Sequence, residues 1–127
     1  MSNNNDTNGQ WIYRVRAQVD PALVSAWVEW MQTAHIPSVM QSGCFTQATF
    51  AQVASDWPAQ ASFVSDSTDW LTFETSYGLV SPEAMTRYLA DHAPRLRQEG
   101  PAFFGAVYAT QVRHTRDWTQ VHATVTP

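Results

Sequence analysis

Histidine, proline, glutamine and glycine recur with the same spacing at two places in the chain. The two copies of this pattern are His35, Pro37, Gln41 and Gly43, and His92, Pro94, Gln98 and Gly100. An imidazole titrates near neutral pH and can act as an acid, a base or a ligand. His35 and His92 are therefore the candidate catalytic residues. A structural interpretation stays open: proline breaks a helix, glycine ends one, and histidine can cap the carbonyl group that proline frees.

Aromatic and basic side chains close to these histidines are the candidate ligand-binding residues. They are Trp27, Tyr88, Arg95 and Arg97. Tyr88 and His92 are spaced to share one face of a helix, which would point both toward a sheet. Arg95 and Arg97 point to different faces of their helix, because positions i and i+2 do not face each other. We expect one arginine to pair with a neighbouring carboxylate and the other to hold an anion at the mouth of a cleft.

Several well-known catalytic and cofactor motifs are missing from the sequence. There is no phosphate-binding loop, dinucleotide fingerprint, GxSxG elbow or HExxH pair. The single cysteine, Cys44, excludes an internal disulfide and a cysteine-based zinc cage. We therefore expect no cofactor and no metal site. A metal site made of His35, His92 and Glu74 is conceivable in geometry and has no support from spacing.

Length and composition limit the possible classes of protein. With 127 residues, 44% of them hydrophobic, the chain suits one domain with its own core. A net charge of −4 argues against nucleic acid as a partner, and no apolar run is long enough to cross a bilayer. We expect a polar leader over residues 1–10, a domain over 11–118 and a tail over 119–127. Because no signal peptide is recognisable, we expect a cytoplasmic protein.

Hydrophobic periodicity predicts six elements in the order strand, helix, strand, strand, helix, strand. Strands are expected over residues 11–19, 45–54, 69–77 and 106–113, with an elaborated connection over 55–68. Helices are expected to start at Asp20-Pro21 and at Ser81-Pro82, to kink near the internal prolines, and to stop at Gly43 and Gly100. This order predicts an α+β, ferredoxin-like βαββαβ domain: a four-stranded antiparallel sheet with two kinked helices on one face.

The second face of that sheet carries a mixture of charged, polar and aromatic side chains. On the first strand it presents Ile12, Arg14, Arg16 and Gln18, and on the third Trp70, Thr72, Glu74 and Ser76. Two helices cover only one face of a sheet, which leaves this face for a partner. We therefore expect a homodimer, in which Arg14 or Arg16 meets an acid such as Glu74.

Three stretches of the sequence resemble a known family. They are WIYRVRAQVD from residue 11, WVEWMQTAHIPSVMQSGCF from residue 27 and YLADHAPRLRQEGPAFFG from residue 88. Over residues 11–118 the chain resembles the uncharacterised family called domain of unknown function 4286. The resemblance implies a ferredoxin-like unit that pairs as a dimeric α/β barrel, and it implies no established reaction. Other members of that fold superfamily include cofactor-free monooxygenases, haem-degrading enzymes and lactone isomerases.

These observations leave three function classes open. The first is a small apolar or anionic molecule bound between helices and sheet, with cofactor-free oxygenase or isomerase-type chemistry. The second is a non-enzymatic dimerisation or interaction module, and the third is a haem-binding protein. A cavity reached by the histidines favours the first class. Within that cavity we expect His92, and we expect a structural role for His35.

Overall fold

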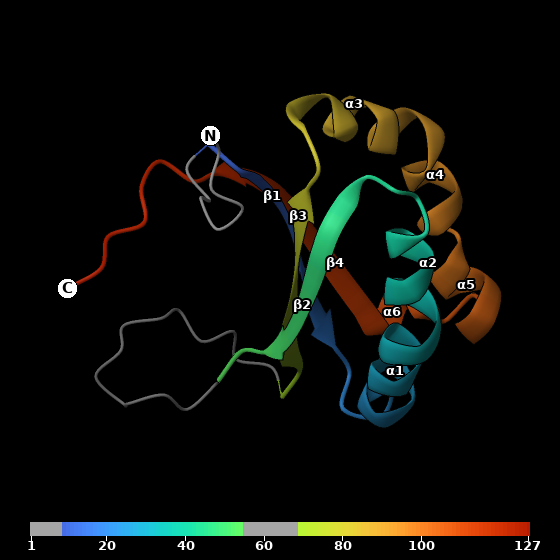
Figure 1. Ribbon diagram of the computed structural model, residues 1–127. Coiled ribbons are helices and arrows are strands. Elements are labelled where there is room, and N and C mark those ends of the chain that lie inside the picture. The colour runs from blue at the N-terminus through green and yellow to red at the C-terminus, as the bar shows by residue number, and fades with distance from the viewer. Residues whose placement is uncertain (1–8, 55–68) are drawn as a thin grey trace.

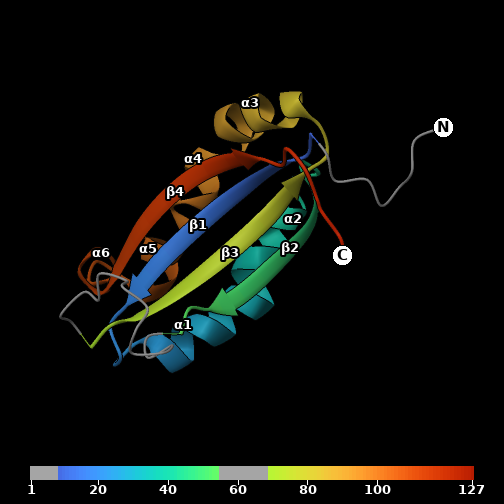
Figure 2. The same ribbon diagram turned by 90° about the vertical axis from the view of Figure 1, so that its left-hand side faces the viewer.

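The computed structural model describes residues 9–54 and 69–127. Residues 1–8 of the expected leader and the expected connection over 55–68 lie outside the described residues. Four antiparallel strands form one sheet in the order β2-β3-β1-β4, which Figure 2 shows from its helix-free side. The strands are β1 (Trp11–Val19), β2 (Phe45–Gln52), β3 (Leu71–Leu79) and β4 (Val112–Gln120). The predicted α+β, ferredoxin-like arrangement is confirmed.

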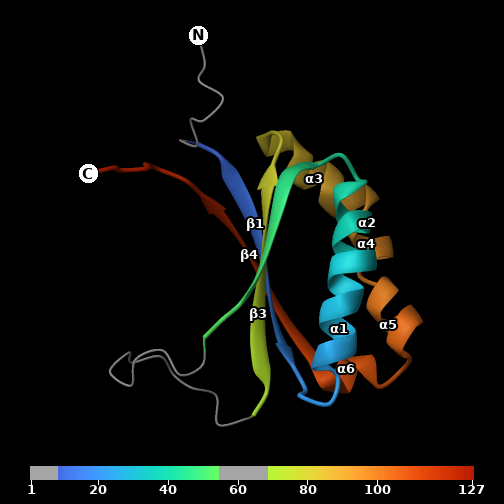
Figure 3. The same ribbon diagram turned by 60° about the horizontal axis from the view of Figure 1, so that its bottom comes forward.

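The first helical stretch follows β1 and runs along the helix-bearing face of the sheet without interruption (Figure 3). It consists of α1 (Val24–Trp30), the π-helix η1 (Met31–His35) and α2 (Ile36–Met40). Ile36 keeps helical geometry before Pro37, with φ and ψ of −59° and −45°. The wide turn explains this, because the Ile36 N–H bonds to the Met31 carbonyl five residues back. The backbone hydrogen bond just before Pro37 therefore spans five residues, where an α-helix would span four.

The second helical stretch is broken into four pieces (Figure 1). They are α3 (Pro82–Asp91), α4 (Ala93–Leu96), α5 (Glu99–Phe104) and α6 (Tyr108–Gln111). The Ser81 hydroxyl caps α3 by accepting from the Ala84 N–H at 3.3 Å, as the Ser-Pro start predicted. Gly100 lies inside α5 and does not end a helix as predicted. Gly105, with φ of 89°, ends α5 instead.

The last strand lies further along the chain than predicted. Residues 108–111 of the expected strand over 106–113 form α6, and β4 begins at Val112. The helix-facing positions of β4 include His114, Arg116 and Trp118, paired with Ala17, Val15 and Tyr13 of β1. Two of these three are polar, so the strand lacks the apolar alternation by which strands are recognised. β4 also extends to Gln120, past the expected domain boundary at residue 118.

The core fills the space between the sheet and the helices as two neighbouring clusters. One contains Tyr13, Phe45, Tyr77 and Tyr88, and the other contains Trp27, Trp30, Phe73 and Tyr108. The positions of β3 that alternate with its predicted second face point inward, since Phe73, Thr75 and Tyr77 are all buried. Among the described residues, no helix is long and apolar enough to cross a membrane. A cytoplasmic location stays a prediction from the sequence.

The other face of the sheet carries charge pairs within one chain. Arg16 Nε donates to Glu74 Oε1 at 2.9 Å, and Arg14 binds both carboxylate oxygens of Asp117 at 3.0 and 2.9 Å. The Arg113 guanidinium lies 4.4 Å from the centre of a Trp70 ring. Arg16 therefore already has Glu74 as a partner across β1 and β3, the pairing that the sequence led us to expect between two copies. The helices of the described chain lie on the opposite face (Figures 1 and 3).

Candidate functional site

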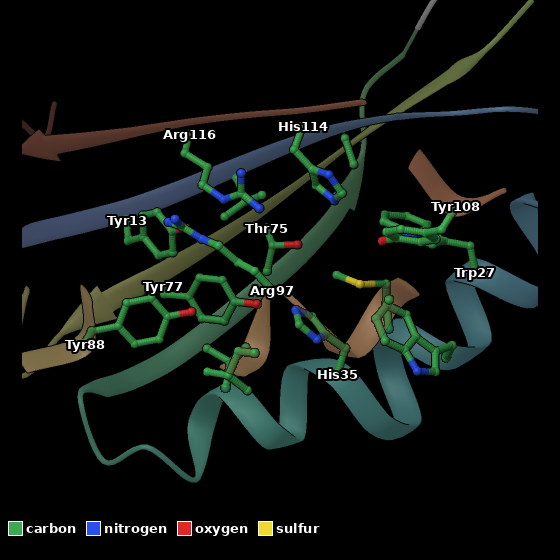
Figure 4. Close-up of a pocket in the computed structure, with 17 residues that line it drawn as sticks. Tyr13, Trp27, His35, Thr75, Tyr77, Tyr88, Arg97, Tyr108, His114 and Arg116 are labelled. Atoms are coloured by element: carbon green, nitrogen blue, oxygen red, sulfur yellow. The ribbon is translucent and has the colours of Figure 1, made fainter. Parts of the chain in front are cut away.

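A cavity of about 50 Å³ lies between the sheet and the helices and is lined by residues of both core clusters (Figure 4). Its lining includes Tyr13, Trp27, His35, Thr75, Tyr77, Tyr88, Arg97, Tyr108, His114 and Arg116. Four of the six residues singled out in the sequence line it, and His92 and Arg95 do not. The cavity is reached by His35, the histidine for which a structural role was expected.

His35 is held by a carboxylate from the second helical stretch. Its Nδ1 lies 2.8 Å from Glu99 Oε1, and its ring stacks on Trp30 at a centroid distance of 4.8 Å. A carboxylate only accepts hydrogen bonds, so this contact places the neutral ring's proton on Nδ1 and leaves Nε2 as an acceptor. Burial lowers the pKa of His35, and the bond to Glu99 opposes that shift. At neutral pH the ring is therefore uncharged and able to take a proton.

The two copies of the repeated sequence pattern meet at this contact. His35 belongs to the first copy, and Glu99 stands between the glutamine and the glycine of the second. Gly100 is buried, and a Cβ atom added to it would overlap the ring of Tyr108. The absence of a side chain at Gly100 thus lets Tyr108 close one side of the cavity. The second copy therefore contributes Glu99 and Gly100 to the site, while its histidine, His92, lies outside the cavity lining.

His114 and Arg116 line the cavity from β4, and sequence reasoning missed both. With Val112 and Trp118 they occupy every second position of β4 and so share one face of the strand. This spacing would have identified both residues if the strand had been predicted at its observed position. Burial lowers the pKa of His114 to about 4, and the charge of Arg116 adds to the shift. His114 is therefore neutral at neutral pH, as His35 is.

Hydroxyl groups supply the other polar atoms of the lining. Burial raises the pKa of Tyr77, Tyr88 and Tyr108, so all three phenols stay protonated. The Trp27 indole N–H donates to the Tyr108 hydroxyl at 3.3 Å, which leaves the Tyr108 proton free to point elsewhere. The Thr75 side chain adds a further hydroxyl on β3 and is 2% exposed. The cavity therefore offers several neutral hydrogen-bond donors.

The remaining predicted residues take different positions. Arg97 is exposed and lines the cavity, so it lies where the cavity meets solvent. Arg95 is exposed and lies outside the lining, which matches the different faces expected from the two-residue spacing. Among the described residues neither arginine forms an ion pair, so the expected pairing of one of them with a neighbouring carboxylate is wrong. His92 also lies outside it, with its ring 6.4 Å from that of Tyr88. The helical stripe of α3 does not continue to His92, because the chain leaves helical geometry there with φ of −125°.

The conceivable metal trio of His35, His92 and Glu74 is not assembled. Glu74 lies on the opposite face of the sheet, paired with Arg16, while His35 lines the cavity between sheet and helices. Within residues 9–54 and 69–127, no three histidine, cysteine, aspartate or glutamate side chains are grouped as metal ligands would be.

The sheet, its one-sided helical cover and the cavity between these two layers define a ferredoxin-like α+β protein. More narrowly, the chain belongs to the family described as Domain of unknown function (DUF4286), whose model matches residues 10–117. No curated protein matches the sequence.

Solved structures share the fold at low sequence identity. A dimeric ferredoxin-like protein from an uncultured marine organism is 9% identical with a TM-score of 0.62, and the match covers 91% of this chain and 98% of that one. A monooxygenase from the gene ActVA-Orf6 of Streptomyces coelicolor, in complex with nanaomycin D, is 16% identical with a TM-score of 0.58 over 99% of each chain. SnoaB, a cofactor-independent oxygenase from Streptomyces nogalater, is 13% identical with a TM-score of 0.55 over 92% and 97%. These likenesses show the fold alone.

Proposed function

We propose that this protein is a small enzyme that binds an organic molecule in the cavity and removes a proton from it with His35. The observation that carries the proposal is the 2.8 Å contact between His35 Nδ1 and Glu99 on a ring that lines the cavity. A base held by a carboxylate at one nitrogen keeps the other nitrogen oriented for proton transfer. The lowered pKa of His35 keeps that second nitrogen unprotonated at neutral pH.

The proposed step is enolisation of a small carbonyl compound. His35 Nε2 takes a proton from the carbon next to the carbonyl, and the electron pair of the broken C–H bond forms a C=C bond. The carbonyl π electrons move to oxygen, where hydroxyl donors of the lining stabilise the negative charge. Return of the proton from His35 to a different atom of the substrate completes an isomerisation.

Oxygenase chemistry would begin with the same proton removal. The names of two similar structures, a monooxygenase and a cofactor-independent oxygenase, support that branch as a second candidate. In it the substrate anion reacts with molecular oxygen as co-reactant. The two branches differ in oxygen uptake, which an oxygen electrode measures directly.

Cavity size does not support haem as the ligand. Pockets for drug-sized molecules hold roughly 300–1,000 Å³, and haem is at least that large. The cavity holds about 50 Å³. A molecule of a few carbon atoms fits this space better than a tetrapyrrole does.

Hydrogen exchange in D2O tests the proposal without knowledge of the substrate. Small ketones and oxo acids, including acetone and pyruvate, are incubated with the protein, and deuterium incorporation is followed by NMR. We expect exchange above the buffer rate for at least one compound, and a loss of roughly 100-fold or more in His35→Gln. His92→Gln is the matched control, since it changes the same residue type at the corresponding place outside the cavity. No exchange with any compound, or full exchange in His35→Gln, contradicts the proposal.

We also propose that two copies pair through the helix-free faces of their sheets. Support comes from that face of the sheet, which no helix of residues 9–54 and 69–127 covers, and from the dimeric ferredoxin-like protein of similar fold. This pairing is equally compatible with a non-enzymatic interaction module. Light scattering at micromolar concentration tests it, and a clean monomer contradicts it.

A further inference from the structure

We infer that the cavity takes a small carboxylate, with its anionic group held between Arg97 and Arg116. This inference rests on the proposed function, since it names the class of molecule on which His35 acts. Three observations support it: the charges of the lining, the positions of the two arginines in different layers of the fold, and the size of the cavity.

The charged groups of the lining leave a positive excess. Arg97 and Arg116 each contribute a guanidinium charge, while His35 and His114 are neutral near pH 7 because burial lowers the pKa of each. Among the described residues that line the cavity there is no aspartate or glutamate, and Glu99, which lies outside the lining, is bonded to His35. A ligand that enters this cavity therefore meets two positive charges.

The arginines of the two sheet faces differ in their partners. On the helix-free face, Arg14 and Arg16 each bind a carboxylate at 2.9 Å. In the part of the chain that the structure describes, neither Arg97 nor Arg116 forms an ion pair or a side-chain hydrogen bond. Both cavity arginines therefore keep their donors available to an anion.

The two guanidinium groups come from different layers of the fold and reach the same cavity. Arg97 follows α4 in the helical layer, and Arg116 stands on β4 opposite Val15, on the helix-facing side of the sheet. Figure 4 shows Arg97 extending from the helical layer toward the sheet, where Arg116 lies. Both charges act on the same groups, since each lowers the pKa of His114 and opposes the rise at Tyr88. An anion in this cavity would be attracted by both charges.

A carboxylate fits this arrangement better than a larger anion. The planar guanidinium fork matches a carboxylate with two parallel hydrogen bonds. A cavity of about 150 Å³ accommodates benzene, and this cavity measures about 50 Å³, so the carbon skeleton is short. With the carboxylate at the arginines, the neighbouring carbon atoms extend into the same cavity that His35 lines. This is the orientation that enolisation of an oxo acid requires.

Binding of pyruvate, compared with its neutral amide, tests the inference. NMR titration of the full-length protein should show saturable binding of pyruvate at millimolar concentration and at least tenfold weaker binding of pyruvamide. Arg116→Gln and Arg97→Gln should each weaken pyruvate binding roughly tenfold, with little effect on the amide. Arg113→Gln and Arg95→Gln are the matched controls, because Arg113 lies on the other face of β4 and Arg95 outside the lining. Higher salt should weaken pyruvate binding in the wild type.

His35→Gln separates failure of this inference from failure of the proposed function. It should bind pyruvate within about threefold of the wild type while losing deuterium exchange. The arginines, and not His35, hold the carboxylate, so the loss of affinity should stay below the value of one hydrogen bond. Equal binding of pyruvate and pyruvamide, no binding of pyruvate, or unchanged binding in both arginine variants overturns the carboxylate site, whatever the exchange assay shows. Arginine-dependent binding with full exchange in His35→Gln supports the carboxylate site and overturns the role of His35.

Discussion

His35 lines the cavity and is bonded to Glu99, whereas His92, at the same place in the second copy of the pattern, lies outside it. Gly43 lies just beyond α2, two residues past its C-cap, with φ of 76° and open space around it, whereas Gly100 lies inside α5 against the ring of Tyr108. The two copies share residue types and spacing and differ in every one of these contacts. The difference arises in the backbone between them.

In the first copy the chain stays helical through its proline, and in the second it does not. The single π-helical turn Met31–His35 holds one residue more than an α-helical turn. Ile36 remains helical before Pro37. The second copy has no such turn, and helical geometry fails at His92 before Pro94. A pattern of residue types therefore places a side chain in a site only together with the geometry of the turn that carries it.

The largest expected difference between the histidines inside and outside the cavity is in how acid changes the free energy of unfolding. The folded pKa values of His35 and His114 lie below the unfolded value near 6.5, so the unfolded state binds more protons. Their contribution to stability is complete above about pH 6.5 and is lost as pH falls toward the folded pKa of His114, about 4. For His114 alone the loss is up to about 3 kcal/mol, at about 1.4 kcal/mol per pKa unit.

Urea unfolding between pH 7 and 4 measures this effect. The difference in unfolding free energy between these pH values should shrink in His114→Gln and shrink further in His35→Gln/His114→Gln. The single variant His92→Gln is the control. If the double variant keeps the full acid dependence of the wild type, the two cavity histidines are not neutral in the folded protein.

The two glycines should respond to substitution in opposite ways. Gly100→Ala should destabilise by about 1–3 kcal/mol, because the new methyl group overlaps the Tyr108 ring in a packed core. Gly43→Ala should lose about 1 kcal/mol through its positive φ alone. Asparagine tolerates that conformation, so Gly43→Asn should be milder than Gly43→Ala, whereas Gly100→Asn should be worse than Gly100→Ala. Thermal unfolding of the four variants gives the order, and a milder Gly100→Asn would mean that Tyr108 moves away readily.

The histidines themselves should differ in stability by a smaller amount. His35→Gln should lose roughly 1 kcal/mol, the value of one hydrogen bond, whereas His92→Gln should stay within about 0.5 kcal/mol of the wild type. A double-mutant cycle of His35→Gln with Glu99→Gln should show a coupling of at least about 0.5 kcal/mol, because the two side chains are in contact. Additive losses would show that the contact does not persist in solution.

The two glutamines should show the smallest effect. Gln41 and Gln98 are both exposed, and within the described residues neither side chain forms a hydrogen bond. Gln41→Ala and Gln98→Ala should each change the unfolding free energy by less than about 0.5 kcal/mol and leave pyruvate binding unchanged. A large loss in either variant would point to a role for the shared glutamine that its contacts do not show.

Local patterns in the sequence predict the order of the elements, the α+β class and the inner faces of β1 and β3. Buried side chains such as Tyr13 and Phe73 repeat every second residue because a pleated strand alternates its faces, and that period is a local property. The start of α3 was equally local, since the Ser81 cap and the following proline act within one turn. The aromatic part of the candidate site, Trp27 and Tyr88, was found for the same reason.

Only the tertiary structure decided which polar side chains form the site. His35 and Glu99 come together from helical stretches that are separated by two strands, and no local period relates them. The position of β4 was missed because its helix-facing side carries His114 and Arg116, so the polar lining of the cavity removed the apolar alternation of the strand. The β4 segment has only a weak local preference for strand structure. Its hydrogen bonds to β1 and its burial outweigh that weakness. That pairing brings Arg116 to the cavity that Arg97 reaches from the helical layer.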